Sequence, residues 1–450
     1  MKVCKLLAAL AFLVGGLLVA ASAAEQVALP EQVFPQLDSI LKAAVQQSPR
    51  MLSRALDLEI AENNRIQTRA GLLPNVGSYF SYYKASDDRA DLSGRHIVDK
   101  VAYNITLTQP LYHWGELKNT ARMGEIQSSI TQGQYREAYR LLAQELRASY
   151  LRLIVQKLAL RRGRFYLDYT RNQLSQQEER FIKKVISEVE ISVARLTAEQ
   201  AQLAAERTEF DYETAKASFA RLAGSTGLAD EAIPDSIPVA AYSAGAFSQL
   251  LAGFLAQKDP PTVEANTLRH QLEIENLNYE IQKTRLRPKL NAVVGTSQDE
   301  QTYSLNVAQK YRVNSIFAGL AVNWMIFDGF SSGAIVRTSL ARRHQLENDY
   351  RQVTERLAQD AQSQVKLINF SARSMAIYDR FLVSGEGYLR TIQDDFKRGV
   401  KSEADVSLAQ ISLYDAQVNA GNARSDYLAK VGDFLGIVMQ DPILANVADK

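Results

Sequence analysis

Residues 181–219, FIKKVISEVEISVARLTAEQAQLAAERTEFDYETAKASF, align without a gap with residues 396–434, FKRGVKSEADVSLAQISLYDAQVNAGNARSDYLAKVGDF. Identical residues recur through both stretches, for example Phe181 and Phe396, Val185 and Val400, Ser187 and Ser402, Tyr212 and Tyr427. The correspondence extends upstream, because Leu72-Leu73-Pro74 matches Leu286-Arg287-Pro288 and Leu111-Tyr112 matches Ile326-Phe327. An internal duplication of this size predicts an architecture built from two similar halves.

Each copy is predicted to contain two long helices joined by a turn. Proline is absent between Pro110 and Pro234 and again between Pro288 and Pro442, and an interior proline would break a helix. The pattern places helices near residues 116–180, 190–223, 331–395 and 404–437. A helix of about 65 residues would be about 100 Å long, so these helices need partners along their sides.

The helices after each turn carry small and apolar residues at steps of three and four. In the first copy these are Ile191, Ala194, Ala198, Ala201, Ala205, Thr208, Tyr212, Ala215, Phe219 and Leu222. In the second copy they are Val406, Ala409, Leu413, Ala416, Ala420, Ala423 and Tyr427. The helix near 116–180 offers the bulkier stripe Leu142, Leu146, Tyr150, Leu153 and Leu158. This heptad spacing is typical of coiled coils.

Four segments alternate in polarity and are predicted as strands, near residues 74–84, 101–113, 288–298 and 314–327. In the last, Ile316, Leu320, Val322 and Trp324 share one face. Polar loops are expected around Asp87-Asp88-Arg89-Ala90-Asp91 and from Asp299-Glu300-Gln301 onward, facing outside. Strands of about ten residues with aromatic ends suit a membrane barrel. Because such barrels have at least about eight strands, four strands must be shared between two or three chains.

The N-terminus predicts a cleaved secretory signal over residues 1–23. Lys2 and Lys5 precede the apolar stretch Leu6–Ala20, and Ala21-Ser22-Ala23 fits a cleavage site. The only cysteine, Cys4, lies inside this segment. The formal net charge of +2 becomes neutral without Lys2 and Lys5, which argues against a nucleic-acid partner. No later apolar run is long enough for a transmembrane helix.

The sequence predicts no catalytic, cofactor or metal site. None of the four histidines, His96, His113, His270 and His344, pairs with another ligand at metal-binding spacing. Gly385-Glu386-Gly387 lacks the preceding strand of a phosphate-binding loop. An enzyme is therefore the function class that the residues favour least.

The order and repetition of several short motifs resemble the TolC-like family of outer-membrane efflux and secretion channels. The motifs are Leu72-Leu73-Pro74-Asn75-Val76, Gln109-Pro110-Leu111-Tyr112, Pro288-Lys289-Leu290, Ile326-Phe327-Asp328-Gly329 and the segment 396–406. The resemblance implies a mixed α/β membrane protein. Three chains would share a twelve-stranded barrel in the outer membrane, continued by a helical coiled-coil tunnel across the periplasm. It also implies contact with outer-membrane lipid.

As partners, the resemblance implies a periplasmic adaptor and an inner-membrane pump or ABC transporter, which would use the chain for efflux or for type I protein secretion. The expected organisation is a first repeat at 24–227, a linker at 228–260, a second repeat at 261–437 and a tail at 438–450.

The turn between the long helices of each repeat is the predicted functional site. Glycine at position 399 can take a positive φ, and Ser187 and Ser402 stand three residues before Glu190 and Asp405, the spacing of a capping box. The resemblance implies that these two carboxylates also form an acidic ring at the narrow end of the tunnel. It assigns adaptor docking to Lys184, Val185, Ser187, Gly399, Val400 and Ser402, and a gate latch to Phe396 and Lys401.

Three positions depart from the family's usual pattern. Lys184 stands where glycine is usual, Leu408 where a further acid often follows, and Phe396 where tyrosine is common. A phenylalanine cannot donate a hydrogen bond, so a gate of similar geometry with a different latch is expected. The alternative function is a secreted periplasmic coiled-coil scaffold without a pore. It explains the secretion signal and the heptads but not the repeated strands.

Overall fold

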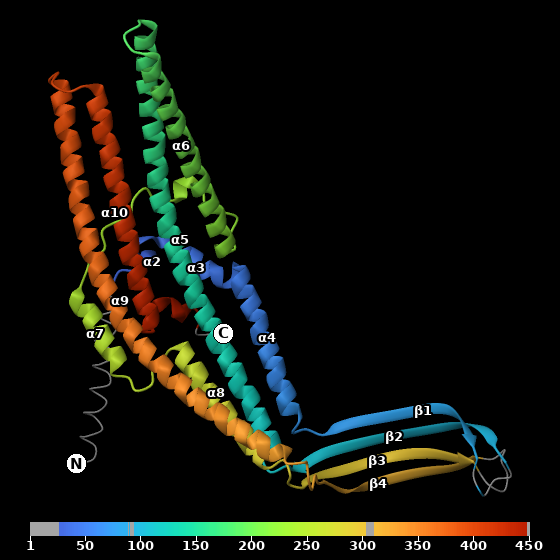
Figure 1. Ribbon diagram of the computed structural model, residues 1–450. Helices are drawn as coiled ribbons and strands as arrows, with labels where there is room; N and C mark the ends of the chain where they lie inside the picture. Colours follow the sequence, from blue (N-terminus) through green and yellow to red (C-terminus); the bar gives the residue numbers. More distant parts are fainter. Residues whose placement is uncertain (1–26, 89, 91–93, 303–309, 448–450) are drawn as a thin grey trace, which may run out of the picture. The chain divides into compact units, whose positions relative to one another are not determined.

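The computed structural model describes residues 27–88, 90, 94–302 and 310–447 (Figure 1). The predicted signal peptide therefore lies outside the described residues. The chain divides into two compact units. Unit 1 holds residues 27–56, Gln134–Ala265 and the chain from Val353 onward, and unit 2 holds Asp57–Gly133 and Asn266–Gln352.

The elements follow the predicted order of two strands and then two long helices in each repeat, and a further helix, α4 or α8, precedes each pair of strands. They are α2 (Pro30–Val33), α3 (Pro35–Gln47), α4 (Pro49–Ala70), β1 (Asn75–Asp87), β2 (His96–Tyr112), α5 (Glu116–Ile182), α6 (Glu188–Ala223), η1 (Asp230–Ala232), α7 (Ala244–Leu255), α8 (Val263–Lys283), β3 (Lys289–Thr302), β4 (Lys310–Asn323), α9 (Ser331–Lys397), α10 (Glu403–Ile437) and η2 (Pro442–Val447). The four long helices and four strands are confirmed, and the expected linker and tail contain the short elements η1, α7 and η2.

Unit 2 contains one antiparallel sheet with the strand order β1-β2-β3-β4 (Figure 1). Both hairpins and the central β2–β3 pair run antiparallel, so the two repeats contribute adjacent halves of a single sheet. Side chains tie the halves together at the helical end of the sheet. The indole Nε1 of Trp114 donates to the Pro288 carbonyl at 2.8 Å, and a ring nitrogen of His113 lies 2.9 Å from the Asn291 amide oxygen.

Several predicted strand boundaries are wrong by three to five residues: β1 ends later than predicted, at Asp87, and β2 and β4 begin earlier, at His96 and Lys310. The fourth strand ends at Asn323, so Trp324, Ile326 and Phe327 lie beyond it. Asn323 pairs with Lys289, the first residue of β3, and the preceding Pro288 has no N–H with which to extend the ladder. The segment Asp299-Glu300-Gln301, expected to begin a loop, instead continues β3, where Glu300 pairs with Arg312 of β4.

Unit 1 contains two antiparallel helix hairpins, which α6 forms with the part of α5 from Gln134 onward and α10 forms with the part of α9 from Val353 onward. The predicted heptad stripes are its core. Tyr212, Phe219 and Tyr427 are fully buried, as are Leu142 and Leu146. The Tyr150 ring lies between Phe34, at a centroid distance of 5.5 Å, and Phe219, at 5.9 Å. Alanine dominates the middle of the α6 seam, so the backbones of α5 and α6 can approach closely.

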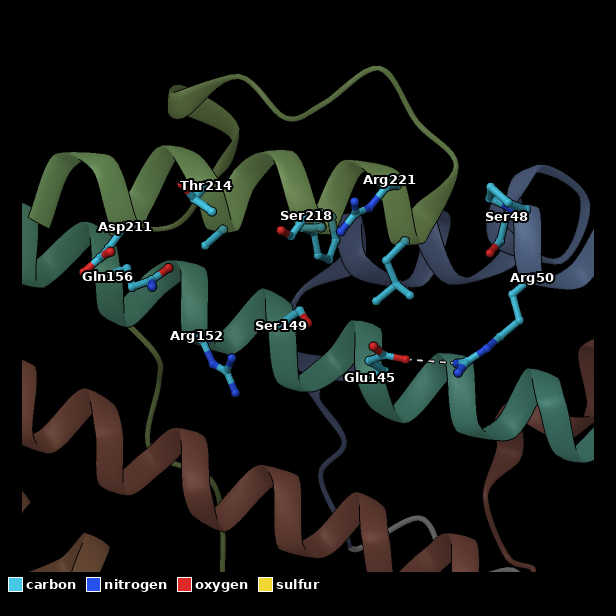
Figure 2. A pocket seen from close by; sticks show the side chains of 14 residues that line it. Ser48, Arg50, Glu145, Ser149, Arg152, Gln156, Asp211, Thr214, Ser218 and Arg221 are labelled. Atoms are coloured by element: carbon cyan, nitrogen blue, oxygen red, sulfur yellow. Dashed lines mark hydrogen bonds and ion pairs between the residues drawn. The ribbon is translucent and has the colours of Figure 1, made fainter. Parts of the chain in front are cut away.

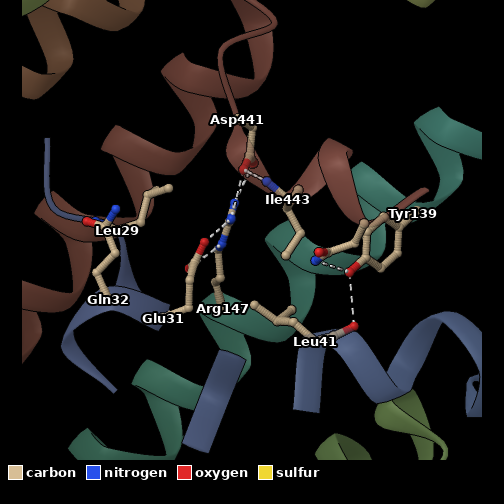
Figure 3. A network of polar contacts seen from close by, with 9 residues as sticks. Leu29, Glu31, Gln32, Leu41, Tyr139, Arg147, Asp441 and Ile443 are labelled. Atoms are coloured by element: carbon tan, nitrogen blue, oxygen red, sulfur yellow. Dashed lines mark hydrogen bonds and ion pairs between the residues drawn. The ribbon is translucent and has the colours of Figure 1, made fainter. Parts of the chain in front are cut away.

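A buried ionic cluster fixes both ends of the described chain to the middle of α5 (Figure 3). The guanidinium of Arg147 donates to Glu31 at 2.9 Å and to the two oxygens of Asp441 at 2.5 and 2.9 Å. Beside it, the Tyr139 hydroxyl donates to the Leu41 carbonyl at 3.0 Å. Burial disfavours the charged form of Arg147, but the hydrogen bond and charge of Asp441, together with Glu31, outweigh it and raise its pKa.

Candidate functional site

The turn after α5 has a defined helix-ending geometry. The Lys184 N–H donates to the Phe181 carbonyl and the Val185 N–H to the Arg180 carbonyl, both at 2.9 Å. These two bonds form a Schellman motif, which requires a left-handed residue just past the helix. Lys184 occupies that position with a φ of 57°, although an L residue with a side chain is strained there.

The turn after α9 has the same geometry with glycine in the left-handed position. The Gly399 N–H donates to the Phe396 carbonyl and the Val400 N–H to the Asp395 carbonyl, both at 2.9 Å. The φ of Gly399 is 76°, which confirms the predicted positive value. The departure at Lys184 therefore changes the residue in the turn but not the form of the turn.

Both predicted capping boxes are confirmed. The Ser187 N–H donates to the Glu190 carboxylate at 2.7 Å, and the Glu190 N–H donates to the Ser187 hydroxyl at 3.3 Å. In the second turn, the Ser402 N–H donates to the Asp405 carboxylate at 2.9 Å, and the Asp405 N–H donates to the Ser402 hydroxyl at 3.2 Å. Each carboxylate is thus held by the serine of its own turn, so the predicted site residues form two clusters, one per turn.

These hydrogen bonds keep both carboxylates ionised. The backbone N–H of Ser187, then its hydroxyl and the charge of Arg180, lower the pKa of Glu190. The backbone N–H of Ser402, then its hydroxyl and Lys401, lower the pKa of Asp405. The Lys401 ammonium lies 3.8 Å from the Asp405 carboxylate. Helix N-termini also favour negative charge. The two turns therefore present fixed anions to solvent at neutral pH.

Apolar side chains surround these charges at the exposed ends of the hairpins α5–α6 and α9–α10, which are called the tips below. Val185 is 62% exposed and Val400 is 70% exposed. Other large apolar side chains exposed near the turns are Ile182, Val189, Val193, Phe396 and Leu408. Because monomeric proteins rarely gather such side chains in one place, the tips have the character of a protein-binding surface. The sequence reasoning assigned Val185 and Val400 to docking but missed Ile182, Val189 and Val193.

The sheet in unit 2 has one predominantly apolar face. The strand register places on it Val76, Phe80, Tyr82, Val101, Tyr103, Ile105, Leu107, Leu290, Val294, Ile316, Ala318, Leu320 and Val322. Many of these are open to the surroundings; Ile316, for example, is 88% exposed. The opposite face holds polar side chains that include Asn104, Thr106, Thr108, Asn291 and Ser297.

Charged pairs end the apolar face on the side away from the helices. Lys84 lies 4.0 Å from Asp99, and Arg312 lies 3.1 Å from Glu300, whose side chain is buried. The apolar part of each outer strand, Val76 to Tyr82 and Ile316 to Val322, spans about 20 Å at 3.3 Å per residue. A band of roughly this height between polar borders is typical of barrels that cross membranes. Sequence reasoning missed this border because it assigned Glu300 to a loop.

No helix in the described part of the chain is long and apolar enough to cross a membrane. Within the same residues, no group of three or more histidine, cysteine, aspartate or glutamate side chains could hold a metal ion.

Comparisons with known proteins agree with this geometry. The chain is 23% identical over 400 residues to the alkaline protease secretion protein AprF of Pseudomonas aeruginosa, an alignment that covers 86% of this chain and 80% of that protein. Its fold is similar to that of the CmeC outer membrane channel of Campylobacter jejuni, with a TM-score of 0.69 at 13% identity over 91% of this chain and 87% of that chain.

A further fold similarity is to the outer membrane protein VceC of Vibrio cholerae, with a TM-score of 0.65 at 14% identity over 92% of this chain and 98% of that chain. The family model of the outer membrane efflux proteins matches residues 40–225 and 264–432. These two ranges cover well over half of the 450 residues and leave out the whole of the expected linker, residues 228–260. The chain belongs to the outer membrane efflux protein family.

Proposed function

We propose that the chain is one of three subunits of an outer-membrane exit duct that serves a tripartite efflux pump or a type I secretion system. In this assembly the sheets of the three copies form a twelve-stranded barrel in the membrane. The helix hairpins form a tunnel in the periplasm, and the hairpin tips dock with a periplasmic adaptor and an inner-membrane pump.

The observation that carries this proposal is a four-stranded sheet with an apolar face and two outer strands. β1 and β4 each have a neighbour on one side only in the described sheet. Unpaired backbone groups are not tolerated in lipid, and four strands are too few to close a barrel. Pairing β1 of one copy with β4 of the next satisfies both conditions, turning the apolar faces toward lipid and the polar faces toward the lumen.

The gate of the duct is assigned to the two hairpin turns. Glu190 and Asp405 are exposed, ionised and held in the first turns of α6 and α10. Three copies would bring six such carboxylates around one axis. A ring of carboxylates in a pore favours cations over anions and binds multivalent cations. Capping the helices and lining the pore are compatible, since a capping carboxylate has further lone pairs free to face the pore.

The remaining tip residues are assigned to docking and latching. Lys184, Val185, Ser187, Gly399, Val400 and Ser402 form the docking surface. Phe396 and Lys401 form the latch. Lys401 supplies the positive charge of this latch through its contact with Asp405, at 3.8 Å. Phe396 can contribute only packing. Opening the tip would therefore require the loss of a weak, solvent-screened ion pair rather than of a buried one.

Single-channel recording in a planar bilayer tests the assignment of the ring. The purified protein should give long-lived openings that favour cations and are reduced by multivalent cations. Glu190→Gln combined with Asp405→Asn should shift the reversal potential in a salt gradient toward zero. Glu188→Gln combined with Glu403→Gln is the matched control, because these acids lie in the same first turns but outside the capping boxes.

Unchanged selectivity in the first double variant would contradict the ring. A protein that stays soluble without detergent and conducts no current would contradict the duct and favour the periplasmic scaffold.

Of the two functions, the sequence comparison favours protein secretion, because the relative in Pseudomonas aeruginosa is named for alkaline protease secretion. Deleting the gene and measuring both secreted protein and drug susceptibility distinguishes protein secretion from efflux. Loss of a secreted protein with unchanged drug susceptibility supports secretion, and the reverse result supports efflux.

A further inference from the structure

The helix layer of unit 1 has two outer helices. Figure 1 shows α9, α10, α5 and α6 side by side in this order. The Phe165 ring of α5 lies 5.4 Å from the Tyr414 ring of α10, and Leu389 of α9 and Leu413 of α10 belong to one buried apolar cluster. The outer helices α6 and α9 therefore each have a neighbour on one side only, as β1 and β4 do in the sheet.

The free side of α6 has an apolar stripe with an acidic edge. Three exposed apolar residues stand at intervals of seven residues, namely Leu196, Leu203 and Phe210. Three exposed acids alternate with them, namely Glu199, Glu206 and Glu213. The combined set steps by three and four residues, which is the spacing of a helix that packs against another helix.

This stripe is separate from the side of α6 that points toward α5. Figure 2 shows Asp211 and Ser218 turned toward α5, where they line a cavity of about 490 Å³. Glu213 follows Asp211 by two residues, which is about 200° around the helix. The acidic edge therefore faces away from this cavity.

The free side of α9 has a matching pattern with the opposite charge. Its exposed bases are Lys366, Arg373 and Arg380, and the exposed apolar residues Phe370 and Ile377 stand between them. These five residues again step by four and three. Within the described residues, the two arginines donate only to carbonyl groups of α9 itself, so no carboxylate neutralises them.

The internal repeat indicates how the two free sides would meet. α9 begins and ends 215 residues after α5, and α10 begins 215 residues after α6. Each position of α5 and α6 therefore has an equivalent in α9 and α10. Because α5 and α10 are in contact, the equivalent contact joins α9 to α6. These two helices lie at opposite edges of the layer in one chain, so a second copy must supply this contact.

The residues that face each other between α5 and α10 are mostly apolar. A Cβ atom on Gly421 would lie 3.1 Å from the Leu158 side chain, and the Phe165 ring contacts the Tyr414 ring. One further step of seven residues leads to Leu151 and Leu428, which are both fully buried.

The equivalents of these three pairs are three pairs of opposite charge. Over the interval of 215 residues they are Arg373 with Glu206, Arg380 with Glu199, and Lys366 with Glu213. The contact within the chain is therefore apolar at the positions where the outer helices are charged. All three acids lie on α6 and all three bases lie on α9.

We propose that α6 of one copy packs antiparallel on α9 of the next copy through these three ion pairs. This contact rests on the proposed function, because only the duct places copies side by side. The apolar residues between the charges form its core, namely Leu203 and Phe210 with Phe370 and Ile377. Two copies of α6 repel each other, as do two copies of α9. Subunits therefore join only head to tail, which is the arrangement that closes a ring.

Cysteine cross-linking in isolated outer membranes tests this register. The only cysteine of the chain, Cys4, lies in the predicted signal. Glu206→Cys combined with Arg373→Cys and treated with a short bis-maleimide should give covalent dimers and trimers on a denaturing gel. Glu206→Cys combined with Arg380→Cys is the matched control, because it is displaced by seven residues, or about 10 Å. It should give at least tenfold less product, and equal yields would overturn the register.

Light scattering of the same protein in detergent distinguishes failure of this contact from failure of the duct. A trimer that does not cross-link would overturn the contact between α6 and α9 and leave the duct in place. A monomer would overturn both.

An exchange of charges tests the ion pairs themselves. Glu206→Arg alone and Arg373→Glu alone should each lower by several degrees the temperature at which the trimer dissociates in detergent, because like charges then face each other. The two together should restore it. Glu206→Arg with Arg380→Glu introduces the same charges in the wrong register and should not. All three positions are exposed, so the single chain should still fold. A first double variant no more stable than its single variants would overturn the pairing.

Discussion

Two groups of ion-paired side chains in unit 1 contain similar charges, but one group is buried and the other is in contact with water. Arg147 is only 2% exposed at its side chain and Asp441 is fully buried, whereas Lys401 and Asp405 at the tip are 40% and 39% exposed. A charge pair that is removed from water depends strongly on its partner, and breaking it is costly. A charge pair in water contributes little and is screened by salt.

This difference in burial distinguishes the part of unit 1 around Arg147, which must stay in place, from the two turns, which can move. The buried cluster holds α2 and the segment after α10 against α5, far from either turn in sequence. The tips are held by capping bonds and one loose ion pair. Thermal motion or a docking partner can therefore rearrange the turns while the buried cluster remains intact. The following predictions test this contrast, from the largest expected effect to the smallest.

Asp441→Ala should lower the free energy of unfolding by about 3–5 kcal/mol, since it leaves the buried Arg147 with Glu31 alone. Asp415→Ala is the control, because its ion pair with Arg162, at 2.9 Å, is only half-buried and should cost less than about 1 kcal/mol. Denaturant unfolding in detergent measures both. Equal losses in the two variants would remove the contrast between buried and exposed clusters.

Gly399→Lys should destabilise its turn by about 1–2 kcal/mol, because the new side chain must adopt the left-handed conformation. Lys184→Gly should stabilise the other turn, since it relieves the same backbone strain there. Hydrogen exchange of amides near each turn measures the effect locally. Faster exchange after Lys184→Gly would show that the lysine side chain supplies a stabilising contact that outweighs its backbone strain.

Ser187→Ala and Ser402→Ala should each cost about 1 kcal/mol of local stability, through the loss of an N-cap. Hydrogen exchange should rise in the first turns of α6 and α10 and stay unchanged around Arg147. Ser192→Ala is the matched control, because its hydroxyl only donates to a carbonyl within α6. A loss spread over all of unit 1 would mean that the tips and the buried cluster are energetically coupled.

Lys401→Gln should give the smallest effect, a higher pKa for Asp405 with no change at Glu190. Lys401 helps to lower the pKa of Asp405, so removing its charge moves that pKa back toward the ordinary value. A carboxylate with a lowered pKa stabilises the fold above its unfolded pKa and loses this contribution as the pH falls through the folded pKa. Cation preference in a Glu190→Gln background should therefore disappear at a higher pH in Lys401→Gln. An unchanged midpoint would exclude Lys401 from the latch.

Most of the fold was predictable because its determinants are local. Proline-free stretches and heptads fixed α5, α6, α9 and α10 to within two residues, and alternation located the four strands. The end of β4 was not predictable in this way. Its alternation runs on through Trp324, Ile326 and Phe327, but the ladder stops where its partner strand begins after Pro288.

The site was predictable where spacing alone defines it and not where distant partners do. The capping boxes follow from a three-residue interval, and the structure confirms both. The bonds of Arg147 could not be read in advance, because Asp441 is 294 residues away and a lone arginine within a helix is usually at the surface. Whether Glu190 and Asp405 face a pore depends on other copies of the chain, so the ring stays a prediction.

The two outer strands, β1 and β4, have a consequence for genetics. If each must pair with a strand of another copy, a subunit with a damaged β1 prevents the barrel from closing in every trimer that contains it. In a cell that makes equal amounts of intact and damaged subunits, random association into trimers leaves only about one assembly in eight free of damage. Proline substitutions in β1 should therefore behave as dominant mutations, even beside a normal gene.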